Sequence, residues 1–319
     1  MTELWVYVEL CREEIRPVTF ELLGKAAELS ARCGGQVTAV ALGDCDTGAL
    51  IAAGADRVLV GEGLPFPAED GLQAQALAEL CSRHHPDMLL LGATGVGRSL
   101  APRTAALLRT GLTADCTRLD LDENGLLLQT RPAFGGNLMA TILCPEHRPQ
   151  MATVRPKVFP MPALDADRRG EVCREALPPM ESPVHLLEDL PAPGGDARLD
   201  ADILVAVGNG IGGDENLAMA RELAQRLDGG LAATRPLVDA GRAPYPHQVG
   251  QTGKTVAPKV YLALGISGAI QHMAGVQAER IIAVNADPDA PIFAQADEAV
   301  VADCGAFLRE LLTLIPQRG

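Results

Sequence analysis

Residues Arg235 to His272 read RPLVDAGRAPYPHQVGQTGKTVAPKVYLALGISGAIQH, and the rest of the chain is interpreted around them. Two polar, glycine-rich loops, Gln248 to Lys254 and Gly265 to Gln271, flank one strand-like apolar run, Val260 to Leu264. Glycine lets the backbone approach a ligand closely, and a loop that enters a helix leaves N–H groups free to bind anions. Because arginine, lysine and histidine add positive charge, the stretch predicts a site for a polyanionic cofactor.

Apolar runs alternate with helical patterns on both sides of this stretch. A strand over Leu4 to Leu10 is followed by helical spacing over Pro17 to Ala31, and the alternation continues to a strand at Met88 to Leu91. A second series begins with a strand over Ala201 to Val207 and ends with a helix over Cys304 to Leu314. We therefore predict an α/β fold with two domains, each a mainly parallel sheet flanked by helices, and a Rossmann-like fold in the C-terminal domain.

Prolines and glycines mark the predicted domain boundary. They punctuate Phe159 to Asp200, which fits an extended passage followed by a linker near Asp189 to Asp200. The predicted domains are an N-terminal α/β domain, residues 1–192, and a C-terminal domain, residues 193–319. Asn124-Gly125, between two alternating runs at Cys116 to Leu121 and Leu126 to Thr130, predicts a β-hairpin.

Three helix boundaries are also expected from local signals. Leu100 to Leu108 reads as a helix after the glycine-rich turn Gly92 to Arg98, for which a structural role is favoured over a nucleotide site. Asp214 is expected to cap a helix that runs through Asp228. Gly268 to Ala274 is expected to form a helix whose N-terminus faces the anion.

Composition excludes several classes of protein. A net charge of −14 argues against nucleic acid as a partner, since phosphate binding needs a basic face. We see neither a secretory signal nor an apolar run long enough to enter a membrane. The 8 cysteines contain no C-x-x-C pair, so we expect no metal site and free thiols in the cytoplasm.

Two nucleotide motifs are incomplete. The spacing G-x-G-x-x-G at Gly208 to Gly213 satisfies the dinucleotide fingerprint, but Ala232 to Arg235 stand where the fingerprint needs an acidic residue. Gly253-Lys254-Thr255 imitates the end of a P-loop, yet Gln248 occupies the required glycine position. Neither a nicotinamide dehydrogenase nor a phosphoryl transferase is favoured.

The longer motifs resemble a known family. QVGQTGKTV followed by GISGAIQH is similar to the signature of electron-transfer flavoprotein alpha subunits. Further matches occur in the same order at Gly92 to Arg98, Arg131 to Asn137, Arg148 to Pro156 and Asn285 to Phe293. The resemblance implies an FAD-containing redox carrier that pairs with a beta subunit and takes electrons from a flavin dehydrogenase, of the acyl-CoA type.

The resemblance also implies which residues hold FAD. They are Asn209, Thr234, Arg235, Val249, Gly250, Gln251, Thr252, Ser267, Gly268, Ala269, Ile270, Gln271, His272, Asn285 and Asp303. Gly208 and Gly210 would allow close backbone approach, while Arg235 would lie against the isoalloxazine, His272 near its carbonyl edge and Thr252 near N5. A cation or donor there favours the reduced flavin, most strongly where water is excluded. The family commonly has arginine where this chain has Asn209.

Other functions stay open. The chain is interpreted as a carrier with no catalytic residue of its own, so whether it is an enzyme is left undecided. Arg235-Pro236 resembles the form found in electron-bifurcating members, in which NADH reduces a flavin of the beta subunit. A third possibility, from another class, is a non-redox nucleotide-binding assembly subunit.

Overall fold

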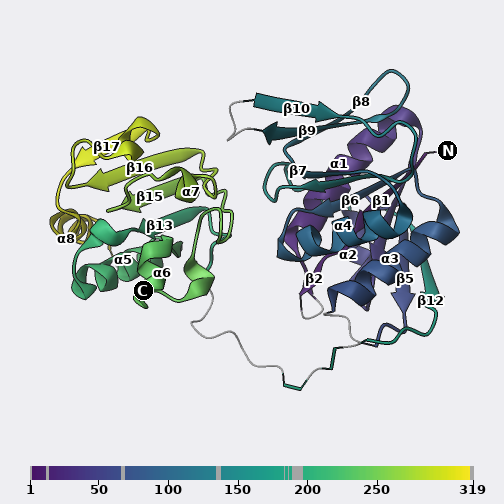
Figure 1. Ribbon diagram of the computed structural model, residues 1–319, viewed down its shortest axis with the longest axis horizontal. Helices are drawn as coiled ribbons and strands as arrows, with labels where there is room; N and C mark the ends of the chain where they lie inside the picture. Colours follow the sequence, from purple (N-terminus) through teal and green to yellow (C-terminus); the bar gives the residue numbers. More distant parts are fainter. Residues whose placement is uncertain are drawn as a thin grey trace. The chain divides into compact units, whose positions relative to one another are not determined.

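The computed structural model describes residues 2–11, 14–65, 69–133, 138–182, 184–185, 187–188 and 197–316. The chain divides into two compact units, Met1–Glu188 and Asp189–Gly319 (Figure 1). The boundary that we predicted at residues 192/193, and most of the predicted linker, lie outside the described residues.

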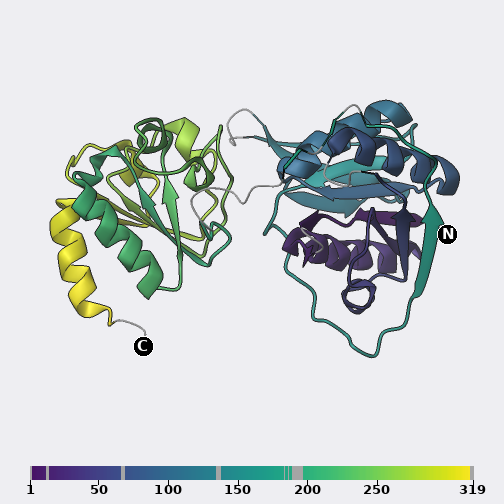
Figure 2. The ribbon, with the colours of Figure 1, turned by 90° about the horizontal axis from the view of Figure 1, so that it is seen from below.

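The first unit is built on a sheet of seven parallel strands in the order β12-β5-β4-β1-β6-β11-β7. The strands are β1 (Glu3–Tyr7), β4 (Gln36–Ala41), β5 (Arg57–Glu62), β6 (Met88–Gly92), β7 (Leu112–Cys116), β11 (Gln150–Val154) and β12 (Glu171–Ala176). The helices are α1 (Pro17–Cys33), α2 (Thr47–Ala52), α3 (Asp70–His84) and α4 (Gly95–Leu108). Helix α1 covers one face of the sheet, and α3 and α4 cover the other (Figure 2).

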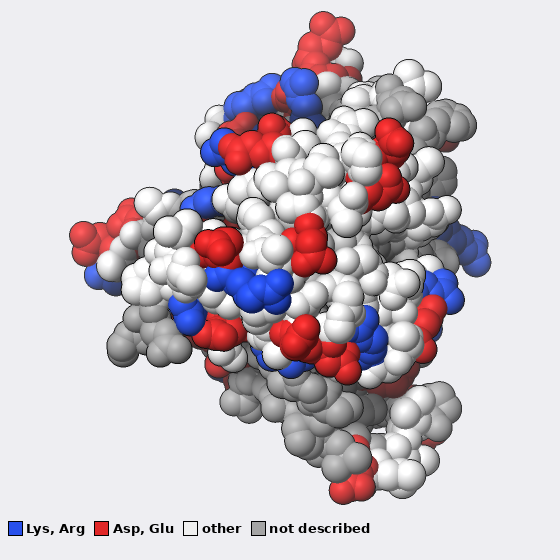
Figure 3. Space-filling model, turned by 90° about the vertical axis from the view of Figure 1, so that its left-hand side faces the viewer, with Lys and Arg blue, Asp and Glu red and all other residues white. Residues whose placement is uncertain are grey.

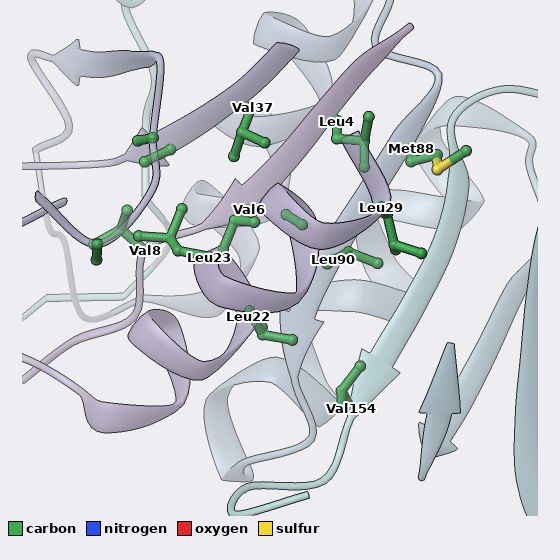
Figure 4. Close-up of a cluster of buried hydrophobic side chains, with 14 of the residues drawn as sticks. Leu4, Val6, Val8, Leu22, Leu23, Leu29, Val37, Met88, Leu90 and Val154 are labelled. Atoms are coloured by element: carbon green, nitrogen blue, oxygen red, sulfur yellow. The ribbon is translucent and has the colours of Figure 1, made fainter. Parts of the chain in front are cut away.

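Strand β1 shows why the apolar runs of this unit are nearly continuous. Leu4 and Val6 point toward α1, where Leu22 and Leu23 meet them (Figure 4), while Trp5 lies in the cluster on the opposite face. Because both faces are covered, each side chain of the strand is removed from water, at about 1.5–3 kcal/mol for a large apolar residue.

An antiparallel arm of three strands leaves the main sheet. It consists of β8 (Arg118–Leu121), β9 (Leu127–Ala133) and β10 (Leu138–Ile142), in the order β10-β9-β8. The predicted hairpin is confirmed, with Gly125 at a φ of 77° in the β8–β9 turn. The single strand expected over Cys116 to Leu121 is wrong, because the chain passes from one sheet to the other at Thr117. The end of the RPAFGGN motif, residues 134–137, lies outside the described residues.

A hydrogen bond joins the segments that follow β1 and β6. Helix α4 begins at Gly95 rather than at Leu100, because the hydroxyl of Thr94 accepts a hydrogen bond from the N–H of Gly97 at 3.0 Å and caps the helix. The same hydroxyl donates to Oε2 of the buried Glu9 at 2.6 Å. A short two-stranded ribbon, β2 (Leu10–Cys11) and β3 (Glu14–Ile15), follows Glu9.

The second unit holds five parallel strands in the order β14-β13-β15-β16-β17. The strands are β13 (Ile203–Val207), β14 (Gly230–Ala233), β15 (Val260–Leu264), β16 (Arg280–Asn285) and β17 (Glu298–Val301). The helices are α5 (Asp214–Arg226), α6 (Arg235–Asp239), α7 (Ile270–Met273) and α8 (Cys304–Leu314), with short 3-10 turns η2 (Asn209–Ile211), η3 (Tyr245–His247) and η4 (Pro291–Ala294). Counted within the unit, the order is 2-1-3-4-5, a doubly wound order whose switch point lies between β13 and β15.

One face of this sheet is covered by α5 and α8, and the other is packed by loop residues such as Val249, Ile266 and Ile292. Two helix predictions need correction here. Gly213, not Asp214, is the N-cap of α5, and Asp214 instead pairs with Arg242.

Helix α7 is one turn long, whereas we expected a helix over Gly268 to Ala274. Gly268 has a φ of 88° and lies against the backbone of Ile292, so no helix passes through it. So short a helix has too few aligned peptide dipoles to attract an anion as expected.

Candidate functional site

A cavity of about 580 Å³ opens at the carboxyl ends of β13, β14 and β15, at the switch point of the second sheet. Its size falls in the usual range for small-molecule sites, and open α/β sheets bind ligands at this position. It is lined by Gly208, Asn209, Gly210, Thr234, Arg235, Pro236, Val249, Gly250, Gln251, Thr252, Gly265, Ile266, Ser267, Ala269, Gln271, His272 and Asn285.

Glycines bring the two loops of the switch point into contact. A Cβ atom on Gly208 would lie 2.3 Å from the carbonyl oxygen of Gly265, and one on Gly265 would lie 2.3 Å from the carbonyl carbon of Gly210. Gly265 also has a φ of 63°, which favours glycine. Side chains at these positions would push the loops apart and reshape the cavity between them.

The 249–252 loop is held on two sides. The N–H of Val249 donates to the carbonyl oxygen of Ala233 at 3.0 Å, which ties the loop to β14. The N–H of Gln251 donates to the carbonyl oxygen of Gln271 at 2.7 Å, which ties it to α7. The loop therefore forms a wall of fixed shape.

The structure brings most of the predicted site residues together. Gly268, Ile270 and Asp303 are the exceptions among them: Gly268 packs on Ile292, and the side chain of Ile270 is 78% exposed. The carboxylate of Asp303 accepts a hydrogen bond from the N–H of Ala306 at 2.8 Å and caps α8. These positions depend on tertiary contacts that a motif match does not contain.

Three lining residues, Pro236, Gly265 and Ile266, were missed by our site prediction. Pro236 directly follows Arg235, and Gly265 and Ile266 begin the glycine-rich loop over Gly265 to Gln271. Their neighbours in the chain were the available signal.

Charge at the cavity comes from one side chain. Arg235 is the charged residue among the described residues that line it, and its side chain is 62% exposed. Its Nε lies 3.2 Å from Oδ2 of Asp239, one turn further along α6. The guanidinium is thus near water and partly neutralised, which weakens the field that it exerts on a ligand.

Polar groups at the cavity have unused hydrogen-bonding capacity. Oγ1 of Thr234 is buried and has no hydrogen-bond partner among the described residues. The N–H groups of Ser267 and Ala269 also donate to no acceptor among the described residues. Thr252 accepts a hydrogen bond from Nε2 of Gln248 at 3.2 Å, which leaves its proton available. Hydrogen-bond donors therefore surround Arg235 in a cavity of small-molecule size. This combination fits a dinucleotide that carries a polar ring system.

His272 is engaged differently from our expectation. Its Nε2 lies 2.8 Å from Oη of Tyr261, and its Nδ1 lies 3.0 Å from the carbonyl oxygen of Val249. Burial lowers the pKa of His272, and the hydrogen bond to Val249 opposes this only in part. We expected the ring to act as a cation or donor toward the cofactor, but both nitrogens are occupied and the ring is neutral.

The arginines of the first unit that sequence motifs singled out have structural roles. Nε and NH2 of Arg155 donate to the two carboxylate oxygens of Asp115 at 2.8 and 2.7 Å, and Arg98 lies 3.3 Å from the same carboxylate. Arg148 donates to backbone carbonyl oxygens of its own loop. These contacts tie loops of the first unit together at Arg148 and Arg155.

The described residues contain neither a cluster of metal ligands nor a membrane-spanning helix. No group of three or more His, Cys, Asp or Glu side chains among them is arranged to hold a metal ion. None of the helices formed by them is long and apolar enough to cross a membrane. On the face drawn in Figure 3, basic side chains are interspersed with acidic ones.

The two sheets and the cavity define a two-domain α/β protein with a candidate ligand site at the switch point of its C-terminal unit. Comparison with known proteins gives the family. The electron transfer flavoprotein domain matches residues 4–180, and the electron transfer flavoprotein FAD-binding domain matches residues 199–277.

Named relatives agree along almost the whole chain. The electron transfer flavoprotein subunit alpha of Thermoanaerobacterium thermosaccharolyticum is 47% identical over 310 residues, which cover 94% of each protein. Protein FixB of Rhizobium meliloti is 40% identical and covers 99% of this chain and 93% of its own length. The lactate dehydrogenase (NAD(+),ferredoxin) subunit LctC of Acetobacterium woodii is 44% identical, over 97% of this chain and 76% of its own length.

The chain belongs to the electron transfer flavoprotein alpha subunit family. Its role is electron transport through a bound flavin, and it pairs with a beta subunit. The resemblance drawn from the QVGQTGKTV and GISGAIQH motifs is confirmed.

Proposed function

We propose that the flavin is FAD, bound in the cavity at the β13–β15 switch point, and that the protein carries electrons from an acyl-CoA type dehydrogenase to a redox acceptor. The observation that carries the proposal is the cavity itself, where glycine-rich backbone, unpaired donors and one arginine converge. FAD, when bound, supplies the one- and two-electron chemistry.

Backbone and side-chain groups at the cavity would have different roles in binding FAD. Gly208 and Gly210 let the backbone approach the pyrophosphate, with N–H groups of Ser267 and Ala269 as donors to anionic oxygens. Arg235 supplies positive charge, and the hydroxyl of Thr252 supplies a proton for a hydrogen bond. The other predicted residues that line the cavity form its walls.

The visible spectrum and flavin content of the heterodimer purified with its beta subunit test the proposal. We expect a yellow protein, one FAD assigned to this chain, and loss of that FAD when the cavity is altered. A colourless heterodimer that binds AMP or ATP would instead support the non-redox assembly subunit. Stopped-flow reduction by purified acyl-CoA dehydrogenases tests the donor, and no reduction by any of them would reject that part.

Electron bifurcation is the second candidate. Pro236 lines the cavity directly after Arg235, which gives this chain the Arg-Pro form, and LctC carries NAD(+) and ferredoxin in its name. Adding NADH to the heterodimer separates the two candidates. Bleaching of the flavin would favour bifurcation, and an unchanged spectrum would favour the simple carrier.

We also propose that the beta subunit covers the antiparallel arm. Strand β10 is an edge strand, and its side chains Leu138 and Met139 are 60% and 56% exposed. An exposed apolar edge favours pairing with another chain. Leu138→Glu should abolish co-purification of the beta subunit, whereas Leu314→Glu, at a still more exposed leucine on α8, should not. Equal recovery in both variants would reject the arm as the interface.

We propose a cytoplasmic localisation, in which the 8 cysteines would stay reduced.

A further inference from the structure

Two buried side chains, Tyr261 behind the cavity and His272 on its wall, have no charge or donor role in the proposed function. Tyr261 on β15 is fully buried, and His272 on α7 is 8% exposed. The ring of His272 makes two contacts. Its Nε2 lies 2.8 Å from Oη of Tyr261, and its Nδ1 lies 3.0 Å from the carbonyl oxygen of Val249. The ring thereby connects β15 and α7 to the 249–252 loop.

The hydrogen-bond partners determine where the protons lie. A carbonyl oxygen only accepts hydrogen bonds, so Nδ1 of His272 must carry a proton to bond Val249. Burial disfavours a charged imidazolium, so Nε2 is unprotonated and accepts a hydrogen bond from the hydroxyl of Tyr261. Burial also raises the pKa of Tyr261, so its hydroxyl keeps the proton that it donates.

We propose that Tyr261 is a positioning residue that keeps the ring of His272 neutral, with its Nδ1 proton on Val249, and so holds the 249–252 loop in place. Arg235 then remains the cation among the described residues that line the cavity. The part of this inference that concerns the flavin rests on the proposed function, whereas the protonation state of the ring does not.

The surroundings of the ring allow a prediction. Among the described residues, Tyr261 from β15 contacts the ring, the loop contributes a backbone carbonyl, and Arg235 from α6 is the charged residue that lines the same cavity. Removing the tyrosine hydroxyl leaves Nε2 without a donor, which makes its protonation easier. A hydrogen bond of about 1 kcal/mol corresponds to an about fivefold change in the protonation equilibrium.

Tyr261→Phe in the full heterodimer tests the inference, with Tyr7→Phe as the matched control. Tyr7 is a buried tyrosine of the other unit, and its hydroxyl makes one hydrogen bond, to Gln73 at 2.8 Å. Two measurements are made from about pH 5.5 to 8: ¹⁵N NMR of histidine-labelled alpha chain, with the His272 signal assigned by its loss in His272→Gln, and the flavin midpoint potential.

In the wild type we expect a neutral ring protonated at Nδ1 across this range. In Tyr261→Phe the ring should protonate about fivefold more readily. Because a protonated ring adds positive charge beside the cavity, the potential of Tyr261→Phe should rise above the wild-type potential increasingly as the pH falls. Tyr7→Phe should follow the wild type in both measurements.

A wild-type ring that is protonated at Nε2, or that titrates like an exposed histidine, overturns the inference without any variant. Potentials of Tyr261→Phe that run parallel to the wild type at every pH also overturn it. If the wild-type heterodimer contains no flavin, the proposed function fails, and the NMR measurement still decides the protonation state of His272.

Discussion

Replacing Arg235 by alanine should lower the midpoint potential of the flavin. A unit charge about 5 Å away contributes about 1 kcal/mol in water and about 3 kcal/mol near a protein surface. Because the side chain is 62% exposed and Asp239 lies 3.2 Å away, the lower half of this range applies, about 1–2 kcal/mol. Since a tenfold change in a one-electron equilibrium is about 59 mV, the expected decrease is about 40–90 mV.

The ion pair also predicts a change of opposite sign. Asp239→Asn removes the negative charge that partly neutralises the guanidinium, so it should raise the potential. Arg280→Ala is the matched control, because Arg280 is an exposed, ion-paired arginine that begins β16, at the end of the sheet away from the cavity.

Spectroelectrochemical titration of the three variants at low ionic strength measures these changes, which should shrink as salt screens the exposed charge. Shifts of Arg235→Ala and Asp239→Asn in the same direction, or shifts no larger than that of Arg280→Ala, would refute the electrostatic role of Arg235.

Three further variants test other parts of the structure. Gly208→Ala places a Cβ 2.3 Å from a backbone carbonyl oxygen, so flavin should be lost while fluorescence of Trp5, the 1 tryptophan of the chain, reports a folded first unit. Asn209→Arg adds a second cation at the cavity and should slow flavin release about fivefold at low salt, about 1 kcal/mol. Burial opposes ionisation of Asp115, but the hydrogen bonds and charge of Arg155 hold its pKa below the usual value. Asp115→Asn should therefore lower the free energy of unfolding by about 1.5–3 kcal/mol at pH 7, as measured by urea unfolding. This difference from the wild type should be undiminished above about pH 4 and should decrease below it, because the wild-type carboxylate becomes protonated.

The fold class could be predicted because its signals are local. The strand at Leu4 to Tyr7 is apolar at every position, which indicates a strand buried on both faces, and Asn124-Gly125 requires a tight turn. The strand order could not be predicted, since it depends on which strands pair. Strand β12 joins the sheet beside β5, more than a hundred residues earlier in the chain, and nothing in its sequence names that neighbour.

The part of the candidate site that is formed by backbone loops could be predicted from the sequence. Glycine-rich loops after β13 and β15 meet at the switch point, and most residues of the motif match line the cavity there. The side-chain roles of His272 and Asp303 were not predictable, because each depends on a partner brought by folding or by a helix start. A sequence shows a histidine inside a motif, but the tyrosine that occupies its ring nitrogen is a property of the packed structure.

The hydrogen bond between Thr94 and Glu9 bears on how many ligands one polypeptide can take up. In each of the two parallel sheets the strand order switches beside the first strand. Such a switch point is a place where an adenine nucleotide could bind. In the amino-terminal half the hydroxyl that caps the helix after β6 is already bonded to the buried carboxyl group of Glu9, which disfavours phosphate at that helix start. Titration with a labelled dinucleotide should therefore saturate at about one equivalent for each copy of this polypeptide, despite the two similar sheets.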